Sequence, residues 1–194
     1  MQNGARISRD HPLRTLFQEL VHKHLFLGAQ LYDTQIAHYV TGVLTDFTHV
    51  DNLYRIRNVR GRLLEDVVEL LIESNPLLDA SSFIREREVR KQIGDFTLFF
   101  TGIFPEAIAS LPRLRPLSLD AFVDYMAAGK RSYGVVASFD LFEYEAEAPL
   151  FRRLSDRFEQ CVFGLNMVKT ELEQLQHTTL RRLRNDLGLD SNGP

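Results

Sequence analysis

The sequence predicts an all-α, single-domain helical bundle of about six or seven helices around a central buried helix over 83–104. Apolar residues recur at spacings of three and four through most of the chain, as they do on one face of a helix. From Ile93 to Phe104 the only charge is Asp95, and a helix that is apolar all round must be surrounded by protein. The 194 residues fit one domain.

The bounds of the helices follow from the residues that begin and end such elements. Pro12 suits a first helical turn with Asp10 as its cap, and Gly28 suits a helix end. Ser81 or Ser82 is expected to cap the central helix. Apart from the central helix, we expect helices over the ranges 12–28, 34–48, 63–74, 118–129 and 149–187, the last as one long helix or two shorter ones.

Two stretches are harder to assign from their pattern. Residues 51–62 interleave arginines with apolar side chains, which predicts a short extended segment or an irregular loop that turns at Asn58 or Gly61. Residues 133–142 combine helical spacing with β-branched side chains, so that a helix and a strand both fit. Because no partner strand is evident, we expect a helix.

The ends of the chain are expected to lie outside the packed core. We expect a disordered leader over 1–11, a single helical domain over 12–187 and a flexible tail over 188–194, with 166–187 as a candidate protruding helix. The N-terminus lacks the apolar run of a signal peptide, and no run of about eighteen apolar residues occurs. With the single Cys161 excluding an internal disulfide, these features predict a cytoplasmic protein.

Composition narrows the classes of function. A formal net charge of −3 argues against a protein that binds nucleic acid through its overall charge, and no membrane partner is expected. The sequence contains no glycine-rich phosphate loop, no paired-cysteine motif and no zinc-ligand spacing. Nothing in it identifies a cofactor.

One candidate site has the spacing of metal ligands. Glu19 and His22 lie three residues apart in the first helix, as do Asp46 and His49 in the second. Carboxylate-bridged di-iron bundles use two Glu-x-x-His pairs and one further Glu from each of two other helices. Because Asp46 stands where those sites carry Glu, and no second inward pair of carboxylates is clear, solvated surface pairs are our preferred interpretation. A metal-dependent helical-bundle enzyme is the third functional alternative.

A second candidate site is a cluster of arginines beside Tyr54. Guanidinium groups bind phosphate or carboxylate in a bidentate manner, and a neighbouring aromatic ring can stack on a base. A solvated loop whose charges pair with nearby acidic residues explains the same pattern. This cluster supports the second functional hypothesis, a regulatory protein that binds an anionic or nucleotide ligand. The arginine cluster comprises Arg55, Arg57, Arg60 and Arg62.

Asp95 is the only charge in the apolar half of the central helix, one turn beyond Lys91. An isolated carboxylate in such surroundings would take up a proton. We therefore expect a cationic or hydrogen-bonding partner, either Lys91 or an arginine from another helix. A buried Lys91–Asp95 ion pair that fixes helix packing is the preferred interpretation, ahead of a functional carboxylate in a cleft.

The C-terminal region supports the leading functional hypothesis, a non-enzymatic helical interaction module that acts as an adaptor or regulatory protein. Its apolar spacing continues after most of the core is accounted for, although the register shifts after Leu175. A helix of this kind can pair with another chain, so we expect contact with a protein partner or self-association as a homodimer. The expected interface residues are Leu172, Leu175 and Leu183.

Overall fold

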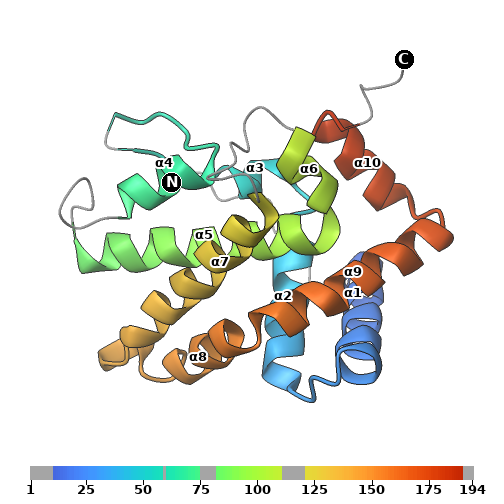
Figure 1. Ribbon diagram of the computed structural model, residues 1–194, viewed down its shortest axis with the longest axis horizontal. Coiled ribbons are helices and arrows are strands. Elements are labelled where there is room, and N and C mark those ends of the chain that lie inside the picture. The colour runs from blue at the N-terminus through green and yellow to red at the C-terminus, as the bar shows by residue number, and fades with distance from the viewer. Residues whose placement is uncertain (1–10, 59, 75–81, 111–120, 190–194) are drawn as a thin grey trace.

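The computed structural model describes residues 11–58, 60–74, 82–110 and 121–189 (Figure 1). In these ranges the chain forms ten α-helices, a π-helix and a 3₁₀-helix, and no strand. The predicted all-α, single-domain fold is confirmed. The helices outnumber the six or seven expected because the C-terminal region, expected as one or two helices, forms three, and a short helix over 50–53 lies next to the expected loop.

The elements have the following bounds. The N-terminal half contains α1 (Pro12–Lys23), the π-helix η1 (His24–Gly28), α2 (Thr34–Asp46), α3 (Val50–Leu53), α4 (Val67–Glu73) and α5 (Phe83–Ile103). The C-terminal half contains α6 (Pro105–Ser110), α7 (Ala121–Ser138), the 3₁₀-helix η2 (Phe142–Tyr144), α8 (Ala148–Asp156), α9 (Phe158–Gln174) and α10 (Thr178–Asp186).

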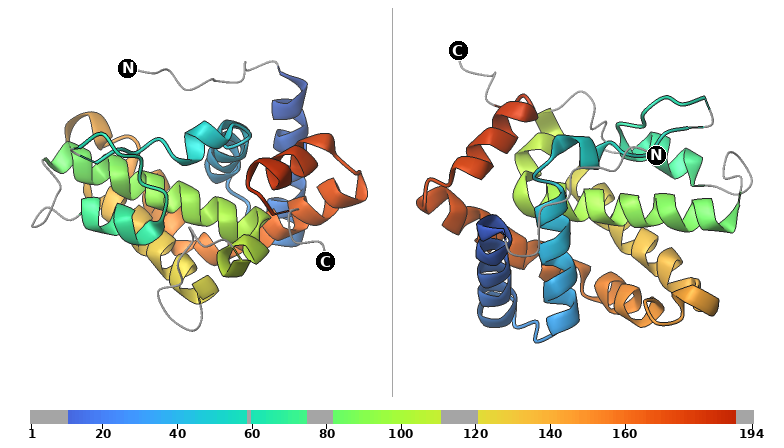
Figure 2. Two further views of the ribbon diagram at one scale, coloured as in Figure 1. Left: turned by 90° about the horizontal axis from the view of Figure 1, so that it is seen from above. Right: turned by 180° about the vertical axis from the view of Figure 1, so that it is seen from behind.

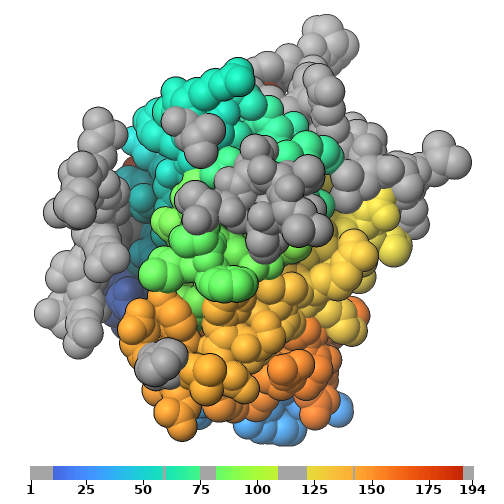
Figure 3. Space-filling view, turned by 90° about the vertical axis from the view of Figure 1, so that its left-hand side faces the viewer, coloured from blue at the N-terminus to red at the C-terminus, as the bar shows by residue number. Residues whose placement is uncertain are grey.

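The helix α5 is buried throughout its second half. Every residue from Gln92 to Ile103 is buried, as the single charge in this stretch predicted. Ser82 caps the helix by accepting a hydrogen bond from the backbone N–H of Arg85. The helices α2, α4, α6, α7 and α9 all contact α5, and α7 crosses it directly (Figure 1). Figure 3 shows α5 between the segment around α4 and the pair formed by α7 and α8.

The helix α7 continues through Gly129, where the sequence predicted a helix end. A Cβ atom at this position would collide with the side chains of Thr97 and Phe158, so the glycine permits close packing of α7 against α5 and α9. The stretch 133–142 therefore begins inside α7. It is helical, as expected, as far as Ser138.

The stretch 51–62 is a short helix followed by a loop. After α3 the chain makes one isolated antiparallel bridge between Arg57 and Leu63, and Gly61 takes the turn with a φ of 78°. The expected extended or irregular segment is thus present from residue 54 onwards. The next helix, α4, begins at Val67 rather than at residue 63.

The prediction of a protruding helix over 166–187 is wrong, because two helices lie in this range and the second packs on the core. The chain leaves α9 after Gln174 and turns through Gln176, which has a φ of 49°, and α10 folds back against the helices α1, α2 and α5 (Figure 2). Leu180, Leu183 and Leu187 are buried in the main core cluster. The register shift noted in the sequence is therefore a turn that lets the apolar face of α10 cover the chain's own core.

The two ends of the chain are only partly described. The expected leader and tail fall largely on residues 1–10 and 190–194, which lie outside the described residues, as does the expected cap Asp10. Within the described part, His11 caps α1 instead. None of the helices in the described ranges has the length and apolar content needed to cross a membrane.

Candidate functional site

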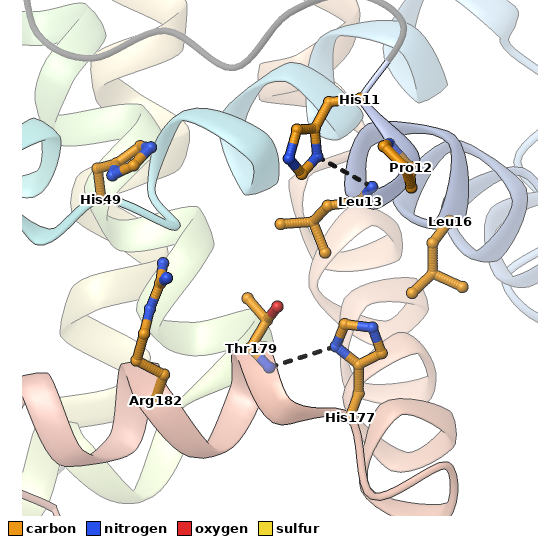
Figure 4. A pocket seen from close by; sticks show the side chains of 8 residues that line it. All are labelled: His11, Pro12, Leu13, Leu16, His49, His177, Thr179 and Arg182. Atoms are coloured by element: carbon orange, nitrogen blue, oxygen red, sulfur yellow. Dashed lines mark hydrogen bonds between the residues drawn. The ribbon is translucent and has the colours of Figure 1, made fainter.

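A pocket of about 500 Å³ lies where the first and last helices meet the connection before α3. This volume is in the range of small-molecule sites. Figure 4 shows the side chains around it, which come from three segments far apart in the sequence. The lining residues are His11, Pro12, Leu13 and Leu16 at the start of α1, His49 before α3, and His177, Thr179 and Arg182 at the start of α10.

Two of the pocket histidines cap helices. His11 Nδ1 accepts the backbone N–H of Leu13 at 3.2 Å, and His177 Nδ1 accepts that of Thr179 at 3.4 Å (Figure 4). A nitrogen that accepts a hydrogen bond carries no proton, so the proton of the neutral ring lies on Nε2. Each ring can therefore donate a hydrogen bond from its Nε2–H group. Histidine therefore occupies the N-cap position of both helices, where Ser, Thr, Asp or Asn is usual.

Arg182 is held beside His49. Its Nη2 donates to the carbonyl oxygen of Thr48 at 2.9 Å, which joins α10 to the connection between α2 and α3. In Figure 4 the Arg182 side chain extends toward His49 on one side of the pocket. Asp186 lies 3.9 Å from Nε of Arg182, so this carboxylate offsets the guanidinium charge only in part.

The electrostatics of the pocket favour an anion. Among the described residues, its lining contains three imidazoles and one guanidinium and no carboxylate. Both α1 and α10 begin at the pocket, so the positive ends of two helix dipoles lie there as well. The arrangement can hold a carboxylate or a phosphate by charge and by hydrogen bonds from N–H groups.

Asp95 lies in the core with 3% of its surface exposed. Lys91 Nζ is 2.8 Å from its Oδ2, which is the ion pair that the sequence predicted, and Arg55 Nη2 is 3.9 Å from the same oxygen. Two tyrosines, Tyr39 and Tyr133, both donate their hydroxyls to Oδ1. Burial, and then the charge of Asp95, raise the pKa of both tyrosines well above their ordinary value, so both remain hydrogen-bond donors. This network ties α2, α5 and α7 together.

The arginine cluster does not converge on a shared site. Arg62 pairs with Glu69 at 2.7 Å, and Arg57 donates to the carbonyl oxygen of Gly61 at 2.9 Å. Arg55 lies near Asp95, and Arg60 is exposed. The side chains of Arg55, Arg57 and Arg62 are thus directed to three different neighbours. No residue of the cluster is among those that line the pocket at α1 and α10.

The four metal-ligand candidates are not assembled into a metal site. Glu19 is exposed on α1, and His22 packs its ring against Phe26 at 4.9 Å between centroids. Asp46 lies at the end of α2, and His49 lines the pocket. Over the described ranges, no group of three or more His, Cys, Asp and Glu side chains is placed to hold a metal ion, the three pocket histidines included.

The expected interface residues require a correction. Leu172 and Leu183 each have 3% of their surface exposed and belong to the chain's own core, because α10 folds back over α9 and α5. They cannot form an outward-facing contact in this fold. Leu175, with 57% of its surface exposed, is the only one of the three at the surface.

Of the charged and imidazole side chains of the pocket, only His49 is a site candidate in the sequence, as one of the four metal-ligand candidates. The sequence contains no comparable motif at His11, His177 and Arg182. The one local signal is a histidine directly before a helix start, at His11-Pro12 and again at His177-Thr178.

Comparisons of the chain with protein-family models, with curated proteins and with solved structures each returned no match.

Proposed function

We propose that this protein is a non-enzymatic helical binding protein, and that the pocket at the starts of α1 and α10 takes a small anion. The observation that carries the proposal is the lining itself, which brings three imidazoles and one guanidinium around about 500 Å³ with no carboxylate among the described lining residues. The proposed function is the second hypothesis from the sequence, a regulatory protein that binds an anion. Its proposed site is the pocket and not the arginine cluster.

The proposed contacts follow from the geometry. Arg182 supplies a permanent positive charge, since guanidinium groups stay protonated in proteins. His11 and His177 supply N–H donors that are already oriented, because their Nδ1 atoms are held by backbone N–H groups. Donors fixed before the ligand arrives lose less conformational freedom on binding.

The test is a titration of the full chain with acetate and with inorganic phosphate at constant ionic strength, followed by NMR of the imidazole groups. We expect saturable shifts at His11, His49 and His177. Arg182→Gln should weaken binding by about tenfold or more, since a charge-assisted hydrogen bond is lost. The matched control is Arg181→Gln, because Arg181 is exposed and does not line the pocket. Absence of saturable shifts with either anion would refute the proposal.

A second candidate function is contact with another protein, which remains the leading hypothesis from the sequence. It is supported by exposed apolar side chains between α1 and α2, where Leu27 of η1 and Tyr32 of the connection to α2 are 78% and 75% exposed. Phe26 lies beside Tyr32 with 5.9 Å between ring centroids. Clustered exposed apolar side chains are typical of protein contact sites.

Light scattering tests this second function. We expect the wild-type chain to form dimers with rising concentration and the double variant Leu27→Ser, Tyr32→Ser to remain monomeric. A wild-type chain that is monomeric at high micromolar concentration would rule out self-association through this surface.

A further inference from the structure

We infer that the ligand of the pocket is an amphipathic monocarboxylate, with one carboxylate and a short aliphatic tail, rather than an inorganic anion. This inference rests on the anion-binding function proposed above and names the chemical class of its ligand.

The first reason is that the pocket lining is partly charged or polar and partly apolar. In Figure 4, His49 and Arg182 lie on one side, and Pro12, Leu16 and His177 lie on the other, with His11, Leu13 and Thr179 between. Leu13 and Leu16 are half-buried and pack against the core. A ligand with its anionic group at Arg182 and an apolar tail toward Leu13 and Leu16 complements this lining.

The second reason is size. A carboxylate or phosphate group alone has about the volume of three or four water molecules, on the order of 100 Å³ at roughly 30 Å³ for each water. The pocket offers about 500 Å³. An anion bound at Arg182 would therefore leave most of this space, and the wall formed by Leu13 and Leu16, to water. An aliphatic tail of several carbons would displace that water from apolar surface, which is favourable.

The third reason is charge. Arg182 is the one lining residue that is permanently charged, and Asp186 at 3.9 Å offsets part of that charge. The neutral imidazoles of His11 and His177 donate hydrogen bonds without adding charge. One guanidinium with neutral donors matches a single negative charge. A phosphate dianion would keep an uncompensated charge in a pocket with an apolar wall.

The experiment is a titration with a homologous series of acetate, butanoate, hexanoate and octanoate, each below its micelle concentration, together with inorganic phosphate. We expect affinity to rise about two- to fourfold for each added methylene until the apolar wall is covered. We also expect phosphate to bind more weakly than hexanoate. The readout is the shift of the His11, His49 and His177 imidazole signals at constant ionic strength.

Three variants locate the two ends of the ligand. Leu16→Ser should reduce the gain in affinity with chain length, whereas Leu16→Met should keep that gain. Arg182→Gln should weaken every member of the series by a similar factor. Leu175→Ser is the matched control, since Leu175 is exposed and does not line the pocket.

The outcomes separate this inference from the proposed function. Equal affinity for acetate and hexanoate, or tighter binding of phosphate than of hexanoate, would overturn the inference and leave anion binding standing. An octanoate affinity that Arg182→Gln does not change would also overturn it, because the tail would then bind elsewhere. Absence of saturable binding for every anion would overturn the function and the inference together.

Discussion

The hydroxyl of Tyr133 on α7 lies 2.9 Å from Oδ1 of Asp95 on α5, inside the core. Tyr39 on α2 donates to the same oxygen, and Lys91 Nζ pairs with the other carboxylate oxygen at 2.8 Å. Because Asp95 is 3% exposed, these partners replace the water that would otherwise solvate its charge. One carboxylate thus fixes the relative positions of three helices.

The first prediction is that Asp95→Ala destabilises the protein by about 3–5 kcal/mol, because Lys91 and two tyrosine hydroxyls lose their shared acceptor. Asp95→Asn should cost less, since an amide oxygen still accepts hydrogen bonds. Urea unfolding followed by circular dichroism measures both changes. Tyr133→Phe, which removes one hydroxyl and keeps the ring, should cost about 1 kcal/mol. An Asp95→Ala variant as stable as the wild type would show that the network contributes nothing.

The second prediction compares two glycines inside helices. A Cβ atom at Gly102 on α5 would lie 2.6 Å from Cβ of Leu165 on α9, and that atom cannot move without its backbone. Gly102→Ala should therefore destabilise by about 1–3 kcal/mol through overpacking, despite the better helix propensity of alanine.

Gly42 on α2 is the matched control, because a Cβ atom there would meet no other atom within 4 Å. Gly42→Ala should stabilise the protein by up to about 1 kcal/mol. Thermal unfolding of Gly102→Ala, Gly42→Ala and the wild type measures both changes in stability. A stabilising Gly102→Ala would mean that α5 and α9 are not in close contact at this point.

The fold could be predicted from the sequence wherever the signal is local. The stretch from Ile93 to Phe104 has one charge, which dictates burial whatever surrounds it, and Lys91 lies one turn from Asp95 in any helix. Gly129 misled the helix prediction because glycine serves both as a helix end and as a point of close approach.

The pocket could not be predicted, because its residues come together only in the folded chain. His11 and Arg182 are brought to one site by the turn at Gln176, which sends α10 back toward α1. The apolar spacing of the C-terminal region is the same whether its leucines face another chain or the chain's own core. Periodicity identifies a buried face and does not identify what buries it.

The third prediction concerns the arginine cluster. Replacing all four arginines by Gln should leave the fold intact and cost little stability, because the Arg62 side chain is 61% exposed and Arg55, 3.9 Å from Asp95, is 43% exposed. Lys91 keeps the closer ion pair with Asp95. Anion binding at the pocket should be unchanged. Calorimetry and the acetate titration test the two statements. A large loss of stability would identify the cluster as structural, and a loss of anion binding would move the site back to it. The four residues are Arg55, Arg57, Arg60 and Arg62.

The fourth prediction concerns pH. Glu106 on α6 pairs with Lys169 at 2.7 Å and with Arg184 at 2.8 Å, so it joins α6 to α9 and α10. Burial raises the pKa of Glu106, but the hydrogen bonds to this carboxylate and the charges of Lys169 and Arg184 together outweigh burial, and the net pKa lies below its ordinary value of 4.5. A carboxyl group whose pKa is lowered by folding stabilises the folded state above its unfolded pKa, and this contribution is lost as the pH falls through the folded pKa.

Glu106→Gln removes this contribution. The variant should be less stable than the wild type by about 1 kcal/mol at neutral pH, a modest value because the carboxylate is partly exposed. The difference should shrink below about pH 4.5, where the wild-type carboxyl also becomes neutral. Urea unfolding of both proteins from pH 7 to pH 3 measures it. A difference that stays constant over this range would mean that ionisation of Glu106 is not involved.

The last prediction distinguishes the two roles that the C-terminal leucines can have. Leu183 packs into the core beside Phe17 and Phe99, whereas Leu175 is 57% exposed at the end of α9. Leu183→Ala should destabilise by about 2–5 kcal/mol through lost burial and the cavity left behind, and Leu175→Ala by less than about 0.5 kcal/mol. Denaturant unfolding at low protein concentration gives both values. If Leu183 instead served an interface between chains, Leu183→Ala would leave the monomer's stability unchanged and weaken only association, and α10 would not be part of the core.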